Sequence, residues 1–113
     1  MIYYHNPRCS KSREGLKIVE NSNKNIDVKL YLSEKITFTE LTQIIDKLKI
    51  KPIDLVRKKE GVVKKENLNF ESMSDKVIIE TLVKHPILIE RPILVSDTQA
   101  IVGRPPELIK TIL

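Results

Sequence analysis

The stretch that decides the fold lies at the start of the chain and reads Met1-Ile-Tyr-Tyr-His-Asn-Pro-Arg-Cys-Ser-Lys-Ser-Arg13. Its apolar residues Ile2–Tyr4 predict a short buried strand, which the turn-forming pair Asn6-Pro7 ends. A helical pattern starts near Ser10, so Cys9 stands at a strand-to-helix turn. The first turn of a helix carries partial positive charge and unpaired N–H groups, and both lower the pKa of a thiol. The sequence therefore predicts one activated sulfur.

The residues beside Cys9, and the absence of any other cysteine, limit the reactions that its sulfur can take part in. Arg8, Lys11 and Arg13 flank Cys9, and nearby positive charge favours the thiolate. Cys9 is the only cysteine, so an intramolecular disulfide is excluded and a zinc site cannot be built from cysteine. A free thiol of this kind persists in a reducing compartment, which predicts a cytoplasmic protein.

Length and composition predict a small globular domain. The chain has 113 residues, of which 41% are hydrophobic and 31% are charged. The start of the chain lacks the basic and apolar regions of a secretory signal, and no apolar run approaches the ~18 residues that span a bilayer. We therefore expect no membrane partner, and the small size is consistent with a monomer.

The net charge of +5 indicates an anionic partner or a solvated basic face. Lysine and arginine cluster between Lys47 and Lys65, which is one pattern of nucleic-acid binding. Aromatic residues make up only 4% of the chain, tryptophan is absent and no nucleic-acid-binding signature occurs. A small anionic substrate fits a positive field equally well, so nucleic acid is not the expected partner.

The remaining patterns predict an α/β chain. Helices are predicted by apolar residues on one face and by capping signals, and strands by alternation. The predicted elements are a helix at Ser10–Asn21, a strand at Ile26–Tyr31, a helix capped by Thr37–Glu40, a short helix from Pro52, a loop with short helical turns at Arg57–Lys65, a helix at about Asp75–Lys84, a hairpin of Ile93–Ser96 and Gln99–Val102 around Asp97-Thr98, and a final helix with Leu108, Ile109, Ile112 and Leu113 on its apolar face. The first two strands should be parallel, joined by a right-handed crossover.

This order is β-α-β, then helices, then β-β-α. It is the order of a thioredoxin-like fold, with a mixed four-stranded sheet and a helical insertion at about residues 37–85. No repeat, linker or low-complexity tract divides the chain, so we expect a single domain over residues 1–113.

Four separated segments resemble signature blocks of the ArsC-like arsenate reductases that work with glutathione and glutaredoxin. The segments are His5–Arg13, Leu55–Lys58, His85–Val95 and Gly103–Pro105. They occur in the family's order and at similar spacings, and the resemblance runs from about Tyr3 to Leu113. An ordered set of this kind is far more specific than a lone cysteine loop.

The resemblance implies that Cys9 is the catalytic nucleophile. Its thiolate would attack the arsenic of arsenate, displace water and form a thiol-bound adduct. Glutathione, as a co-substrate, would reduce this adduct, and glutaredoxin would resolve the mixed disulfide. No bound cofactor and no metal are implied.

The same resemblance implies three anion-binding arginines, Arg57, Arg91 and Arg104. Arsenate is a tetrahedral oxyanion, and planar guanidinium groups bind such ions better than lysine does. Arg91 and Arg104 each precede proline, which favours extended turn positions near strand ends.

Other matched positions would support the sulfur. His5 and Ser12 are implied to activate the thiolate, His5 by lowering its pKa and Ser12 through a hydrogen bond from its hydroxyl. Asn6 and Pro92 would have structural roles near the site, and Pro92 matches the proline that thioredoxin-like folds commonly keep in cis. Ser12 stands where a Cys-x-x-Cys motif has its second cysteine, so an external thiol would be required.

Two other functions remain open at this stage. One is a related thiol reductase that acts on a different oxyanion or on glutathionylated protein. The other is a transcriptional regulator of the Spx type, which has a thioredoxin-like fold, binds RNA polymerase and senses redox state with a Cys-x-x-Cys pair. Ser12 in place of the second cysteine argues against disulfide sensing.

Overall fold

The computed structural model describes all 113 residues, which form two compact units. One unit carries the sheet and comprises residues 1–34 and 91–113, and the other is helical and comprises residues 35–90. The helical unit includes the predicted insertion of about 37–85. The assignment of the whole chain to one domain stays a prediction.

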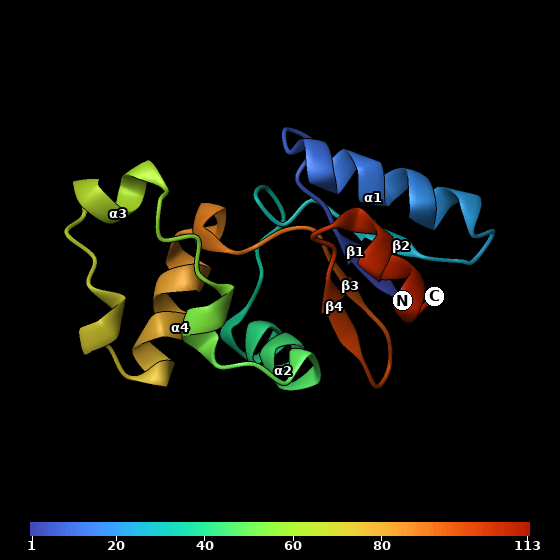
Figure 1. Cartoon of the computed structure of the whole chain (residues 1–113). Helices are drawn as coiled ribbons and strands as arrows, with labels where there is room; N and C mark the ends of the chain where they lie inside the picture. Colours follow the sequence, from blue (N-terminus) through green and yellow to red (C-terminus); the bar gives the residue numbers. More distant parts are fainter. The chain divides into compact units, whose positions relative to one another are not determined.

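The sheet unit contains a four-stranded mixed sheet (Figure 1). Its strands are β1 (Ile2–Tyr4), β2 (Asp27–Lys29), β3 (Ile93–Val95) and β4 (Ala100–Val102), in the order β2-β1-β3-β4. β1 runs parallel to β2 and antiparallel to β3, and β3 pairs antiparallel with β4. The predicted α/β class and the parallel β-α-β start are therefore confirmed.

Helix α1 (Ser10–Asn21) packs beside the sheet, next to a C-terminal 3-10 helix (Pro106–Thr111) (Figure 1). A core cluster joins residues from both helices and two strands: Tyr3, Val19, Leu94 and Ile109. Gly15 lies at a close approach of α1 to β1 and to the C-terminal 3-10 helix, because a Cβ atom there would meet Tyr3 Oη and Ile109 Cδ1. The middle of α1 is thereby packed against β1.

The predicted final helix differs from the structure in its pitch and its apolar face. Its hydrogen bonds join residues three apart, as from Leu108 N to Pro105 O and from Ile112 N to Ile109 O. In a 3-10 helix the side chains at i and i+3 align, so Pro106 and Ile109 share the buried face. Leu108 lies off that face and is 38% exposed, so the prediction that it shares the apolar face of the helix is wrong.

The β3–β4 hairpin closes around a serine side chain. Ser96 N donates to Gln99 O at 2.7 Å, while Gln99 N donates to Ser96 Oγ at 2.9 Å. The hydroxyl thus takes the place of a backbone acceptor, which explains how Asp97-Thr98 turns without the glycine that two-residue hairpins favour.

The helical unit contains α2 (Phe38–Leu48), α3 (Gly61–Lys65) and α4 (Asp75–Lys84), with 3-10 turns at Pro52–Leu55, Phe70–Ser72 and Pro86–Leu88. Thr37 and Glu40 form the predicted capping box at the start of α2. α2 packs against α4, and the apolar faces of the two helices supply the buried residues Leu41, Ile44, Ile45, Ile78, Ile79 and Leu82.

The structure contains neither a helix that could cross a membrane nor a cluster of side chains that could hold a metal ion. No helix has the length and apolarity that a membrane crossing requires. No group of three or more His, Cys, Asp or Glu side chains is placed to hold a metal ion.

Candidate active site

Cys9 occupies the N-cap position of α1. Its backbone is extended, with φ −96° and ψ 122°, and its carbonyl accepts from Arg13 N at 3.0 Å, as the first hydrogen bond of the helix. Cys9 N donates to Asn6 O at 3.0 Å, and the Asn6 side chain accepts from Arg8 N at 3.0 Å. These bonds shape a tight loop that leaves the half-buried sulfur at the open end of the helix.

The surroundings of Cys9 lower the pKa of its thiol. Partial burial alone would raise it, since a charged sulfur loses hydration. Hydrogen bonds from the backbone N–H groups of Ser12 and Lys11, and from the Arg91 side chain, stabilise the thiolate and outweigh that effect. The structure therefore agrees with the activated sulfur that the sequence predicts.

Two arginines approach the sulfur from the start of β3 and the end of β4. Arg104 Nη1 lies 3.8 Å from Cys9 Sγ and 3.2 Å from the Arg91 carbonyl oxygen. Gly103 N donates to Pro92 O at 2.8 Å, which ties the two arginine-bearing segments together. The Arg91–Pro92 bond is cis, as expected, and the Arg104–Pro105 bond is also cis, which the sequence did not indicate.

A buried polar network lies behind the cysteine loop. Ser12 is 0% exposed, and its hydroxyl contacts His5 Nδ1 at 2.7 Å and accepts from Asn6 N at 2.9 Å. Tyr3 donates its hydroxyl hydrogen to the Ser12 carbonyl oxygen at 2.6 Å. Since Ser12 belongs to the first turn of α1, this network orients the N–H groups that face the sulfur.

His5 and Ser12 belong to this network, and their predicted roles in activating the thiolate stay predictions. Burial, aided by the charge of Arg13, lowers the pKa of His5 and so favours its neutral imidazole. The Ser12 hydroxyl bonds to His5 and Asn6, and it is the Ser12 backbone N–H that supports Cys9.

Sequence reasoning missed Tyr3. The sequence predicts Tyr3 only as a strand residue, yet its ring lies 5.7 Å from the His5 ring, centroid to centroid. Residues at i and i+2 on a strand share a face, so the Tyr3–His5 spacing is the signal that could have found it.

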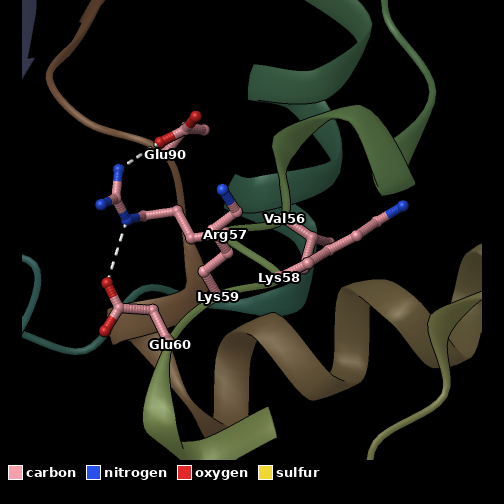
Figure 2. Close-up of a pocket in the computed structure, with 6 residues that line it drawn as sticks. All are labelled: Val56, Arg57, Lys58, Lys59, Glu60 and Glu90. Carbon is pink, nitrogen blue, oxygen red and sulfur yellow. Dashed lines mark hydrogen bonds and ion pairs between the residues drawn. The ribbon is translucent and has the colours of Figure 1, made fainter.

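Arg57 lies in the helical unit (Figure 2). It lines a pocket of about 420 Å³ together with Val56, Lys58, Lys59, Glu60 and Glu90. Burial would lower the pKa of its guanidinium, but hydrogen bonds to Glu90 and Glu60 raise it overall. The structure thus brings Arg91 and Arg104 to Cys9, whereas a role of Arg57 beside them stays a prediction.

The thiol pKa is directly measurable, because Cys9 is the only cysteine. We expect it to lie below the free value of ~8.5. A lowered pKa keeps the thiolate present at lower pH. The rate of alkylation by iodoacetamide should therefore reach half its maximum below pH ~8.5. Urea-unfolded protein is the control and should titrate near the free value. A native midpoint at or above the unfolded one would contradict activation of the sulfur.

A mixed four-stranded sheet, with a free cysteine at the N-cap of its first helix, is the arrangement of the thioredoxin-like class of α/β proteins. The ArsC family model matches residues 4–112, and the chain belongs to the ArsC family. The solved structure of an arsenate reductase from Vibrio cholerae has a TM-score of 0.92 and 40% identity, covering 99% of this chain and 96% of that one. This likeness confirms the predicted thioredoxin-like fold.

Two relatives match almost the whole length of the chain. An arsenate reductase of Haemophilus influenzae is 39% identical over 114 residues, covering 100% of this chain and 98% of the relative. The uncharacterized protein YfgD of Escherichia coli is 39% identical over 113 residues, covering 97% of this chain and 93% of the relative.

Proposed function

We propose that the chain is an arsenate reductase-like oxidoreductase in which the Cys9 thiolate attacks a bound oxyanion. The observation that carries this proposal is the placement of one sulfur, with a lowered pKa, against the guanidinium groups of Arg91 and Arg104. The family and the arsenate reductase relatives support arsenate as the first substrate to test.

The groups that stabilise the thiolate would also bind the oxyanion. The N–H groups at the start of α1 and the side chains of Arg91 and Arg104 all present hydrogen-bond donors. Such donors bind a tetrahedral anion and remain aimed at the charge that develops during attack.

In the first chemical step the Cys9 sulfur forms a bond to arsenic. An As–OH group takes up a proton and leaves as water, so arsenic stays in the +5 state. Covalent capture divides the two-electron reduction into thiol-exchange steps.

Reduction follows when glutathione attacks the adduct. Its thiolate forms a disulfide with Cys9, the S–As bond breaks, and the bonding electron pair stays on arsenic. Arsenic is thereby reduced to the +3 state and leaves as arsenite, while the two sulfurs are oxidised to a mixed disulfide.

Restoration of Cys9 requires an outside thiol, because Ser12 cannot form a disulfide. A glutaredoxin thiolate would attack the glutathione sulfur and release Cys9 as a thiolate. This route agrees with the cytoplasmic compartment predicted from the single cysteine.

The test is an NADPH-coupled assay with glutathione, glutathione reductase and glutaredoxin, supplied with arsenate and a panel of other oxyanions. Cys9-dependent NADPH oxidation with arsenate supports the proposal. If only another oxyanion or a glutathionylated protein is turned over, that compound, and not arsenate, is the substrate. Retention of RNA polymerase without any oxyanion turnover would favour the regulator.

Arg91→Lys should raise KM for arsenate about tenfold, because lysine keeps the charge but loses the planar fork that holds two anion oxygens. Steady-state kinetics over a range of arsenate concentrations measures the change. Lys17→Arg is the control, since it exchanges the same two residue types at an exposed position further along α1. Equal kinetics for both variants would remove Arg91 from the anion site.

A further inference from the structure

Strand β2 forms an open edge of the sheet, because the order β2-β1-β3-β4 leaves one side of it without a neighbouring strand. Asp27 N donates to Met1 O at 3.0 Å. Lys29 O accepts from His5 N at 2.9 Å, so the backbone groups of Asp27 and Lys29 face β1. Successive residues of a strand direct these groups to opposite sides. The N–H and C=O of Val28 therefore face the open edge, where another strand can pair with them.

The side chains along this edge are apolar on one face and charged on the other. Val28 is 44% exposed and Leu30 is 38% exposed, whereas Ile26 packs in part against the core cluster. Side chains at i, i+2 and i+4 of a strand share a face, so these three apolar residues lie together. Asp27 and Lys29 alternate with them and lie on the opposite face.

The turn after β2 closes one end of the open edge. Leu30 N donates to Glu34 Oε2 at 2.7 Å. Leu30 O accepts from Ser33 N at 3.0 Å and from Glu34 N at 2.8 Å. The next outward-facing residue after Val28 is thus already paired within the chain. A partner strand must therefore form its hydrogen bonds around Val28 and cannot extend them through Leu30.

The segment Ile26-Asp-Val-Lys-Leu30 is complementary to a second copy of itself. If two copies pair antiparallel with Val28 opposite Val28, the two valines exchange two N–H···O bonds. Asp27 of each copy then lies opposite Lys29 of the other copy. These flanking positions are non-hydrogen-bonded pairs, where opposite side chains come closest and where opposite charges stabilise the pair. On the other face, Ile26 of each copy lies opposite Leu30 of the other.

Charge and hydrogen bonding disfavour the neighbouring registers. A slip of two residues in one direction places Asp27 opposite Asp27. A slip of two in the other direction places Lys29 opposite Lys29 and Val28 opposite Leu30, whose N–H is already bonded. Like charges directly opposite each other destabilise a strand pair. A slip of one residue sets Val28 against a residue whose backbone groups face β1, so the symmetric register is the favoured one.

We propose that two copies of the chain associate through β2, as a symmetric antiparallel strand pair centred on Val28. The pairing joins the two four-stranded sheets into one continuous sheet, and each copy contributes the same patch. The contact is small, so association is weak and depends on concentration. At high concentration the dimer replaces the monomer that the size of the chain suggests. The inference does not depend on the proposed function.

The first test is sedimentation equilibrium of the full chain at low ionic strength, from about 10 μM to about 1 mM, which should show a monomer–dimer equilibrium. Asp27→Lys places lysine opposite Lys29, and Lys29→Asp places aspartate opposite Asp27. Each should weaken association about tenfold or more. Lys76→Asp is the control, because it makes the same charge change as Lys29→Asp at an exposed position of α4. It should associate within about twofold of the parent.

An equimolar mixture of Asp27→Lys and Lys29→Asp tests the register. In a mixed pair every lysine at position 27 or 29 of one copy faces an aspartate of the other copy. The mixture should therefore form a heterodimer at least as tight as the parent dimer, although neither variant associates well alone. The double variant Asp27→Lys/Lys29→Asp should also regain the parent affinity.

Val28→Pro tests the hydrogen bonds of the edge. It removes the outward N–H and leaves the bonds between β1 and β2, as proline does on edge strands, so association should be lost while the circular dichroism spectrum is kept. In the parent, exchange of the Val28 amide hydrogen should slow as the protein concentration rises. This measurement needs no substitution and decides the matter if a variant fails to fold.

Three results would overturn the inference. One is a parent chain that stays monomeric up to about 1 mM, in which case Asp27 and Lys29 protect the edge from pairing. Another is a dimer that persists unchanged in Asp27→Lys, or that folded single variants fail to restore when mixed. The third is Val28 amide exchange that is independent of concentration while a dimer forms, which would place the contact on another surface.

Discussion

Cys9→Ser is expected to abolish oxyanion turnover, with a loss of about a thousandfold or more. The serine hydroxyl remains protonated at neutral pH, so the groups that stabilise the Cys9 thiolate have no anion to act on. An oxygen at this position also cannot form the disulfide through which electrons reach arsenic. The NADPH-coupled assay measures the loss directly.

The fold should survive this substitution, because the half-buried sulfur is not part of the core cluster. Circular dichroism and the thermal midpoint should match those of the parent. Ser10→Ala is the matched control on the same turn, where an exposed side chain is removed, and it should keep its turnover. Substantial activity in Cys9→Ser would refute the proposed chemistry.

Gly15→Ala is expected to lower the free energy of unfolding by about 2 kcal/mol, although alanine favours a helix over glycine by ~1 kcal/mol. The added methyl group would meet the Tyr3 hydroxyl and would lie 2.6 Å from Ile109 Cδ1. Overpacking costs about 1–3 kcal/mol, and displacing Tyr3 also weakens its hydrogen bond to Ser12, worth ~1 kcal/mol. The free-energy cost of the steric clash therefore exceeds the gain in helix propensity.

Urea denaturation of the parent and the variant measures this difference. Gly61→Ala, at the start of α3, is the matched control, because a Cβ atom there meets nothing within 4 Å. It should be neutral or stabilising by up to about 1 kcal/mol. A Gly15→Ala protein as stable as Gly61→Ala would show that α1 can move away from β1 without cost.

Much of the fold followed from local signals that tertiary packing did not override. The capping box at Thr37 and Glu40 marked the start of α2, and the predicted end of α4 at Lys84 is its observed end. Alternation located β2, but the strand is Asp27–Lys29 and therefore shorter than the predicted Ile26–Tyr31. The C-terminal helix was harder to predict, because an apolar residue at every third or fourth position fits both an α-helix and a 3-10 helix. Close packing of Ile109 against Gly15 of α1 and against Gly103, which follows β4, accompanies the tighter form.

The candidate site was less predictable from sequence. Local chemistry indicated the thiolate, and the resemblance supplied the arginines, since nothing local distinguishes Arg91 from a surface arginine. The partners of Ser12 and the two carboxylates on Arg57 depend on side-chain directions and long-range pairing. Glu90 lies 33 positions from Arg57 in the sequence, a separation that residue patterns within one segment cannot bridge.

The burial of Ser12 has a consequence for where the electrons of the proposed reaction come from. With its hydroxyl committed to His5 and Asn6 and with no second cysteine in the chain, the protein has no internal means of storing oxidising equivalents. In the proposed reaction, every catalytic cycle would draw both electrons from external thiols. The turnover rate would then depend on the redox state of the surrounding thiol pool.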